Sequence, residues 1–193
     1  MSRKQLSKDV IIEATLLLIE EKGNSGKVNF REIGRSLGCA HTSLYNFFPS
    51  YNELLYTAAQ TLMTRMRDSL QSEALERIKK GTYDSMILAY INSVVLYALN
   101  HKGWYSFLWF EYAEIDLTSL FENQPRPEKL LLPIYLQEYK HPISNADATM
   151  KLQVCHGFVH GELSKFLSGR SAYTSENELI ESIMRHVKWL LDL

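Results

Sequence analysis

The sequence of 193 residues is long enough for one large domain or two small ones. Apolar residues make up 46% of it and charged residues 22%, a balance that excludes a disordered chain, a collagen-like repeat and a coiled-coil rod. The formal net charge is -1, so a nucleic-acid partner would have to be met by a local surface rather than by the field of the whole protein.

The cysteines and the N-terminal residues bear on the compartment. Cys39 and Cys155 are too few and too far apart in the sequence to form a disulfide framework or a zinc ligand set by themselves. The first eight residues are charged and lack the apolar core of a signal peptide. Apolar runs stay shorter than the roughly 18 residues that a membrane helix needs. We therefore expect a cytoplasmic protein with no membrane partner, no metal and no cofactor.

The first elements in chain order are helical. Capping residues and glycine or proline stops predict three short helices, at about 7–22, 29–38 and 41–47. Asn29 followed by Glu32 has the spacing of a capping box. Pro49 restricts the residue before it and ends the third helix. Ser50 and Glu53 repeat the capping-box spacing, which predicts the start of a long helix.

Longer helices are predicted for the rest of the chain. Apolar residues recur with helical spacing in residues 86–99, 145–167 and 176–193. Between them lie an aromatic-rich segment at 103–115 and an interrupted helical region bracketed by prolines at 125–142. We find no strand-like alternation, internal repeat or low-complexity tract. The predicted fold class is all-α, with about nine helices.

Residues 29–47 have the layout of a helix-turn-helix, in which two short helices are joined by a tight turn, here at Gly38. The second helix of this motif lies in a major groove of DNA. Its polar side chains at His41, Thr42, Ser43 and Asn46 are short enough to reach base edges or phosphates. The alternative is an ordinary helical corner in a packed core, which a polar face makes less favourable.

Four runs of sequence carry a resemblance to a known family: Phe30-Arg31-Glu32-Ile33-Gly34, Leu37-Gly38-Cys39, Ser43-Leu44-Tyr45-Asn46-Phe47-Phe48-Pro49-Ser50 and Glu53-Leu54-Leu55. Together they resemble the DNA-binding region of the tetracycline-repressor-like (TetR) transcriptional regulators. The aromatic run that ends in Phe-Pro-Ser is the most specific part. The resemblance covers about the first 60 residues, and the remainder agrees in length and helical layout.

The resemblance implies both an architecture and a function. Residues 1–50 would form a three-helix DNA-binding domain, and residues 51–193 a larger helical domain for effector binding and dimerisation. The implied function is that of a sequence-specific regulator and not of an enzyme. It would be a ligand-responsive repressor that binds a palindromic double-stranded DNA operator as a homodimer. The alternative is a DNA-binding activator or chromosome-organising factor without a small-molecule inducer.

The resemblance also assigns the residues that would contact DNA: Asn29, Arg31, Ala40, His41, Thr42, Ser43, Tyr45, Asn46 and Tyr51. Asn29 would begin the second helix, where free N–H groups meet a phosphate. Ala40 to Ser43 would lie nearest the base edges, and Tyr45 would donate its hydroxyl to a phosphate. The sequence departs from the family at Ala40, which cannot cap a helix, and at Tyr51, where lysine is common.

An aromatic stretch supplies the candidates for a ligand pocket: Tyr90, Trp104, Tyr105, Trp109 and Tyr112. By itself, the stretch is better explained by a filled core. The family resemblance favours a pocket, because relatives bind inducers among their middle helices. Three nearby acidic residues, Glu111, Glu114 and Asp116, would suit an apolar or cationic effector.

The last two helices are the expected dimer interface. Gly157 and Gly161 place small residues four apart, and Ile183 and Val187 lie on the apolar face of the final helix. The alternative for the glycines is packing within one subunit. His156 and His160 are also four residues apart, which raises the alternative of a metal-dependent enzyme that uses Glu162 as well. Glu162 is only two residues from His160, so it lies elsewhere on the helix and this alternative lacks a third ligand.

Overall fold

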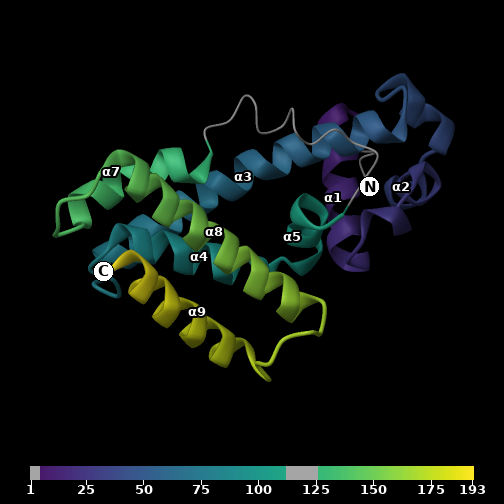
Figure 1. Ribbon diagram of the computed structural model, residues 1–193. Helices are drawn as coiled ribbons and strands as arrows, with labels where there is room; N and C mark the ends of the chain where they lie inside the picture. Colours follow the sequence, from purple (N-terminus) through teal and green to yellow (C-terminus); the bar gives the residue numbers. More distant parts are fainter. Residues whose placement is uncertain (1–4, 112–125) are drawn as a thin grey trace. The chain divides into compact units, whose positions relative to one another are not determined.

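The structure, a computed structural model, describes residues 5–111 and 126–193. These residues form eight α-helices and two short 3-10 helices, with no strand among them (Figure 1). The all-α class predicted from the sequence is confirmed. The chain divides into two compact units, one made of Met1–Met66 and His101–Leu120 and the other of Arg67–Asn100 and Phe121–Leu193.

The two units share one long helix, α3 (Tyr51–Lys79), which crosses the boundary between them. The other elements of the first unit are α1 (Lys8–Lys22), η1 (Ser25–Lys27), α2 (Phe30–Leu37), η2 (His41–Asn46) and α5 (Lys102–Trp109). The other described elements of the second unit are α4 (Met86–Asn100), α7 (Pro127–Glu138), α8 (Asn145–Leu167) and α9 (Glu176–Leu191). The functional division predicted at residue 50 differs from this spatial one and stays a prediction.

Side-chain caps fix where the helices begin. Oxygens of five capping residues accept hydrogen bonds from backbone N–H groups in the first turn: Ser7, Asn29, Ser50, Ser144 and Ser175. These bonds satisfy N–H groups that have no partner within the helix. At the other end of α2, Gly38 has φ 65°, a left-handed conformation that favours glycine. The helix starts predicted from the sequence are thereby confirmed.

Two predicted elements differ in detail. The third short element is a 3-10 helix that ends at Asn46, not a regular helix to Phe47. Ala40 makes no side-chain cap hydrogen bond, and 3-10 geometry is typical of such short pieces. In the proline-bracketed region, α7 continues through Pro133 instead of stopping there. Pro133 is exposed, so its ring is accommodated on the solvent side of the helix.

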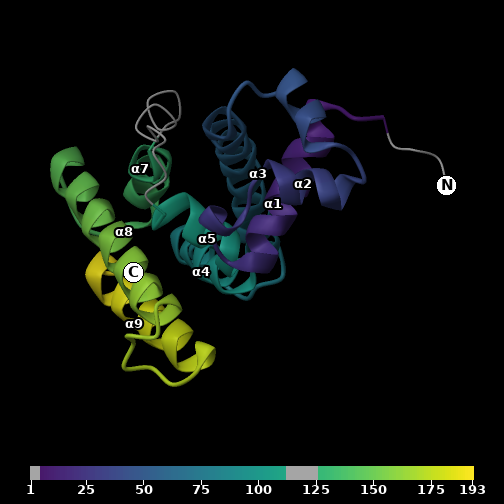
Figure 2. The same ribbon diagram turned by 90° about the vertical axis from the view of Figure 1, so that its right-hand side faces the viewer.

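In the first unit, α5 lies directly against α1 (Figure 2). Gly103 makes this approach possible, because a Cβ atom placed there would lie 2.7 Å from the Cα of Glu20 and 2.7 Å from the carbonyl oxygen of Ile19. The indole N–H of Trp104 donates to the carbonyl oxygen of Leu16 at 2.7 Å. The backbone N–H of Trp104 donates to Oε2 of Glu20, also at 2.7 Å. These contacts hold the two helices in one arrangement.

In the second unit, α4 packs against α7, α8 and α9, and α8 also contacts α7 and α9. Polar contacts fix the ends of these helices. Glu138, at the end of α7, accepts hydrogen bonds at 2.6 Å from the Ser85 hydroxyl and from the backbone N–H of Met86 at the start of α4. The buried hydroxyl of Tyr135 donates to the carbonyl oxygen of Leu191 at 2.9 Å. None of the described helices combines the length and apolarity needed to cross a membrane.

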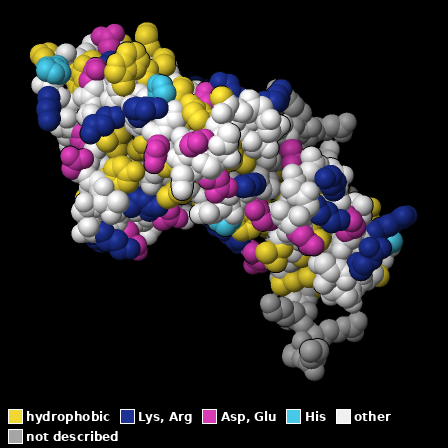
Figure 3. Space-filling model, turned by 90° about the horizontal axis from the view of Figure 1, so that it is seen from below, with side chains coloured by type: hydrophobic (Ala, Val, Ile, Leu, Met, Phe, Trp, Pro, Cys, Tyr) yellow, Lys and Arg dark blue, Asp and Glu magenta, His cyan; other side chains and the backbone are white. Residues whose placement is uncertain are grey.

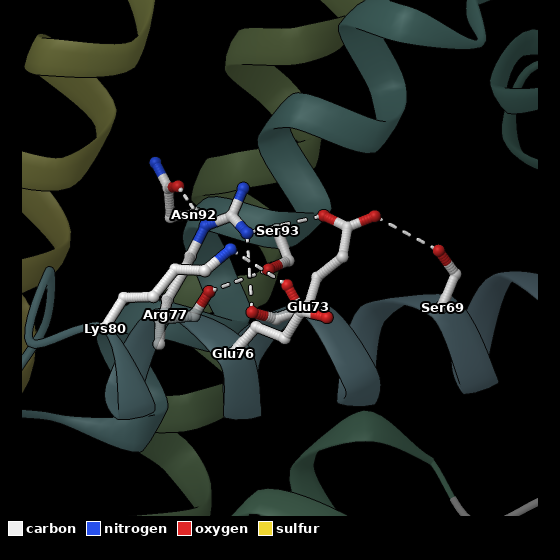
Figure 4. A network of polar contacts seen from close by, with 8 residues as sticks. Ser69, Glu73, Glu76, Arg77, Lys80, Asn92 and Ser93 are labelled. Carbon is white, nitrogen blue, oxygen red and sulfur yellow. Dashed lines mark hydrogen bonds and ion pairs between the residues drawn. The ribbon is translucent and has the colours of Figure 1, made fainter.

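A polar network joins the C-terminal part of α3 to α4 (Figure 4). Nε of Arg77 donates to Oδ1 of the buried Asn92 at 3.1 Å. The Arg77 guanidinium also pairs with the carboxylate of Glu73 at 3.6 Å, and Glu73 accepts a hydrogen bond from the Ser69 hydroxyl at 3.1 Å. The network therefore satisfies the polar group of Asn92 inside an apolar helix contact.

Candidate nucleic-acid interface

A surface hollow of about 420 Å³ lies beside the helix-turn-helix. Its lining residues come from α2, η2 and the first turn of α3: Asn29, Phe30, Arg31, His41, Tyr45 and Tyr51. Five of these six were predicted from the sequence to contact DNA. Phe30 forms the floor of the hollow, since it is 6% exposed and its ring meets the ring of Tyr45 edge-on with centroids 4.7 Å apart.

The remaining predicted DNA contacts lie on and beside η2. Thr42 and Asn46 are exposed, as is Ala40 just before the helix, while Ser43 is half-buried. Leu44 faces the opposite way and is fully buried, so it anchors the element to the core. This amphipathic arrangement presents short polar groups outward on a fixed support.

The start of α2 is capped by an exposed asparagine and carries an exposed arginine. Oδ1 of Asn29 accepts hydrogen bonds from the backbone N–H groups of Arg31 and Glu32, at 3.0 and 3.1 Å. These two N–H groups are therefore not free as predicted, and a phosphate here would meet the exposed side chains of Asn29 and Arg31. A helix start with an exposed arginine suits a phosphate group.

The structure gives Tyr51 a different role from the predicted phosphate contact. Its hydroxyl donates to the backbone carbonyl oxygen of Ser25 at 3.1 Å. Burial raises the pKa of the Tyr51 hydroxyl, and the nearby carboxylates of Glu111 and Glu32 raise it further, so the hydroxyl stays protonated. Tyr51 therefore supports the hollow from behind, and its ring packs edge-on against Phe30 with centroids 5.8 Å apart.

Charge near the hollow is balanced rather than strongly basic. Lys22 forms an ion pair with Glu32, which reduces the positive charge that α1 and α2 offer. On the face shown in Figure 3, Lys and Arg side chains are intermingled with Asp and Glu side chains. Through residue 60 the sequence has seven basic and six acidic residues, so we expect few phosphate contacts per protomer.

Comparison with solved structures places this arrangement in a known fold. A TetR transcriptional regulator from Rhodococcus sp. RHA1 matches with a TM-score of 0.58 and 18% identity, over 95% of this chain and 94% of that one. RolR, solved without ligand, matches with a TM-score of 0.56 and 14% identity, over 96% of both chains. A possible TetR family transcriptional regulator from Streptomyces coelicolor A3(2) matches with a TM-score of 0.57 and 14% identity, over 96% of this chain and 97% of that one. The chain has a TetR-like fold.

The resemblance noted in the sequence is thus confirmed at the level of the fold, and it extends over both units rather than the first 60 residues alone. No family model matches the sequence, and no curated protein matches it either.

The predicted pocket residues are divided between the two units. Trp104, Tyr105 and Trp109 belong to α5 in the first unit, where Trp104 bonds α1 and Tyr105 is 1% exposed. Tyr90 lies on α4 in the second unit and lines a cavity there. Tyr112 lies outside the described residues, as do Glu114 and Asp116. The structure therefore does not bring the predicted set together as a single lining.

The cavity beside Tyr90 has a volume of about 350 Å³ and is lined by residues of α3, α4 and α7. Most of its wall is apolar, and its charged group is Arg67 on α3. Burial raises the pKa of the Tyr90 hydroxyl, against the opposing effect of the Arg67 charge. The cavity thus offers an apolar surface with a phenol and a guanidinium as polar handles.

The four residues predicted to form the dimer interface fall into two exposed and two buried positions. Gly157 and Gly161 are exposed on α8, and a Cβ atom added at either would meet nothing within 4 Å. Ile183 and Val187 are 0% exposed within the single chain, so their side chains form part of its core and cannot reach a partner. The sequence showed the apolar stripe of α9 correctly, but it did not show that α4 and α8 already cover it.

The rings of His156 and His160 lie close together on α8, with centroids 4.2 Å apart and their planes tilted by 59°. Burial, together with the neighbouring His156, lowers the pKa of His160 to about 3. Glu162 is engaged by Lys165 at 2.7 Å. In the part of the chain that the structure describes, no group of three or more His, Cys, Asp or Glu residues could hold a metal ion. The metal-enzyme alternative therefore gains no third ligand from the described residues.

Sequence reasoning missed how the end of α5 supports the helix-turn-helix region. The backbone N–H of Ser25 in η1 donates to Oε2 of Glu111, two residues after the end of α5, at 2.8 Å. Trp104 was assigned to a pocket, although its indole N–H needs a partner when it is buried. The adjacent Gly103 was the available signal, since a glycine inside a helix often marks close approach of another backbone.

Proposed function

We propose that this protein is a cytoplasmic, sequence-specific DNA-binding transcriptional regulator that acts as a ligand-responsive repressor. The observation that carries the proposal is the hollow beside η2, where the side chains of Asn29, Arg31, His41 and Tyr45 converge in a chain with a TetR-like fold. Thr42 and Asn46 would reach base edges, while Asn29, Arg31 and Tyr45 would contact phosphates. Helix-turn-helix proteins place this element in a major groove.

The proposed division of roles predicts different results for two variants. Tyr45→Phe removes an exposed hydroxyl from the rim of the hollow, so it is expected to weaken binding to all duplexes by a similar factor. Thr42→Ala is expected to change which base is preferred at one position of each half-site. Competition binding with a panel of single-position duplex variants distinguishes the two. A uniform loss for both variants would contradict the assignment of Thr42 to base contact.

We propose that the functional form is a homodimer held by α8 and α9. A cleft of about 600 Å³ on these helices is lined by apolar side chains that are exposed in the single chain. Met150 is 62% exposed, Val154 54% and Trp189 75%. Large apolar side chains exposed together indicate a surface that a partner covers. Gly157 and Gly161 continue the α8 part of this surface and allow a second helix to approach closely.

We propose that the α3–α4–α7 cavity binds the effector, and that the effector is apolar with a negatively charged end. The apolar wall supports the first part, and the Arg67 guanidinium supports the second. Of the three acidic residues that suggested a cationic effector, Glu111 belongs to the other unit and bonds Ser25 there, and Glu114 and Asp116 lie outside the described residues. An open cavity favours a ligand-responsive regulator over the alternative of a DNA-binding factor without an inducer.

Helix α3 offers the link between effector and DNA. Arg67, Ala74 and Leu75 on α3 line the cavity, and Tyr51 at the start of the same helix supports the DNA-facing hollow. An effector that favours one position of α3 would shift the protomers between two spacings of their η2 elements. The leverage equals the difference in effector affinity between the two states, commonly about 1–3 kcal/mol.

Two fluorescent probes of similar size test the proposed chemistry of the cavity. Arg67→Gln is expected to weaken binding of the anionic probe anilinonaphthalene sulfonate by about three- to fivefold, the range of a partly exposed charge pair. Binding of the neutral probe N-phenylnaphthylamine is expected to stay unchanged. Trp189→Ala serves as the control that removes binding at the α8–α9 cleft. Equal losses for both probes would contradict the role of the Arg67 charge.

A further inference from the structure

We propose that Glu111 is a positioning residue for DNA recognition that acts through Ser25 and Tyr51. The proposal rests on the DNA-binding function proposed above. Glu111 is 86 positions from Ser25 in the sequence and lies outside the predicted DNA-binding domain of residues 1–50. The two residues nevertheless belong to the same compact unit.

A continuous set of contacts leads from Glu111 to the hollow. Ser25 uses both of its backbone groups, because its N–H donates to Oε2 of Glu111 at 2.8 Å and its carbonyl oxygen accepts from the Tyr51 hydroxyl at 3.1 Å. The Tyr51 ring packs on Phe30, and Phe30 in turn packs on Tyr45 at the rim. A shift of Ser25 therefore displaces the aromatic floor on which the exposed Tyr45 rests.

The burial of this carboxylate argues against a purely stabilising role. Ser25 is 5% exposed, and Oε1 of Glu111 is buried without a hydrogen-bond partner in the described part of the chain. Burying a carboxylate oxygen in this way costs free energy. The other oxygen, Oε2, accepts a hydrogen bond from Ser25 in η1, the short helix that precedes α2. The carboxylate is thus one of the groups that fix η1, together with the Asn24 cap and the Val28 N–H, which donates to the Ser25 carbonyl oxygen at 3.0 Å.

Glu20 provides a matched comparison within the same unit. Its Oε2 accepts a hydrogen bond from the backbone N–H of Trp104 at 2.7 Å, which joins α1 to α5. The two carboxylates make the same kind of bond with nearly the same length. Glu111 accepts from Ser25, whose carbonyl oxygen accepts from the Tyr51 hydroxyl. Glu20 instead accepts from Trp104 in α5. Loss of either bond loosens the unit, and loss of the Glu111 bond also leaves the buried Ser25 N–H without its partner.

The test compares Glu111→Ala with Glu111→Gln in the full-length protein, using a duplex recovered from a random pool by the wild-type protein. Both variants remove one negative charge, so any change in attraction to phosphates is common to them. Glutamine keeps an acceptor oxygen for the Ser25 N–H and alanine does not. We expect Glu111→Ala to bind the duplex about three- to tenfold more weakly than Glu111→Gln, the range of a single hydrogen bond.

A double-mutant cycle separates positioning from general loosening. In the background of Tyr51→Phe, which removes the hydroxyl that Ser25 accepts from, the loss caused by Glu111→Ala is expected to shrink. The loss caused by Glu20→Ala is expected to be the same in both backgrounds. If Glu111→Ala does not fold, Glu111→Asp is compared with wild type, because it withdraws the carboxylate by one methylene at constant charge.

The outcomes distinguish this proposal from the function on which it rests. Wild-type protein that binds no duplex overturns the proposed function and this proposal with it. Wild-type protein that binds the duplex, together with equal affinities of Glu111→Ala and Glu111→Gln, overturns this proposal alone. Additive effects of Glu111→Ala and Tyr51→Phe also overturn it, since they would show that Glu111 does not act through Tyr51.

Discussion

Replacing Gly34 by alanine is expected to weaken binding of the operator duplex by tenfold or more, while the fold is retained. Gly34 lies in α2 beneath the turn of the helix-turn-helix. A Cβ atom there would lie 3.0 Å from the carbonyl oxygen of Cys39 and 3.0 Å from the backbone nitrogen and Cα of His41. These are backbone atoms that cannot rotate away, so we expect the added methyl group to displace η2 relative to α2.

The cost in affinity follows from the position of η2. Each base contact that is misplaced costs about 1–3 kcal/mol, and a dimer carries the displacement twice. Alanine is a better helix former than glycine by up to about 1 kcal/mol, which offsets part of the loss of folding stability. The effect is therefore expected mainly in DNA binding, measured by fluorescence anisotropy with the selected duplex.

Ser36→Ala is the matched control, because Ser36 is exposed on the same helix and its replacement adds no atom against η2. It is expected to leave duplex affinity within about twofold of the wild-type value. Wild-type affinity in Gly34→Ala would show that η2 accommodates the methyl group or that it does not contact DNA. Thermal unfolding followed by circular dichroism verifies that each variant is folded.

Gly103→Ala is expected to lower the free energy of unfolding by about 1–3 kcal/mol, the usual cost of overpacking. The added Cβ atom would lie 2.7 Å from the Cα of Glu20 and 2.7 Å from the carbonyl oxygen of Ile19. Because both are backbone atoms of α1, α5 must move away from α1. That movement lengthens the two hydrogen bonds by which Trp104 holds α1.

Urea unfolding monitored by circular dichroism measures the effect. Ser106→Ala is the control, since it changes a half-buried side chain of the same helix without adding an atom. Its free energy of unfolding is expected to stay within about 0.5 kcal/mol of the wild-type value. An unchanged or higher stability of Gly103→Ala would contradict the close approach of α5 and α1.

Much of the fold could be predicted from the sequence because local signals decide it. The caps at Ser7 and Asn29 and the glycine at Gly38 each act within a few residues, and the structure uses all three. The predicted capping box is only half formed, because Glu32 pairs with Lys22 through Oε1 and its Oε2 is buried without a hydrogen-bond partner among the described residues. The 3-10 geometry of η2 was less accessible, since it follows from the missing cap at Ala40 and from packing of Leu44. Short helices are decided by tertiary contacts more than by propensity.

The candidate site could be predicted only where its residues are close in sequence. Asn29, His41 and Tyr45 come from one motif, so a local pattern was enough to bring them together. The bond from Glu111 to Ser25 joins distant segments and had no local signal. The same limit explains Ile183 and Val187, because an apolar stripe does not reveal whether its cover comes from the same chain or from a partner.

Selection of bound sequences from a random pool of DNA duplexes at physiological salt tests the central claim most directly. A homodimeric regulator with η2 as its reading element is expected to enrich a palindrome whose half-sites lie about one helical turn apart. The enriched duplex also serves as the probe for the Gly34, Tyr45 and Glu111 variants. Failure to enrich any sequence, with protein shown to be folded and dimeric, would contradict DNA recognition by this chain.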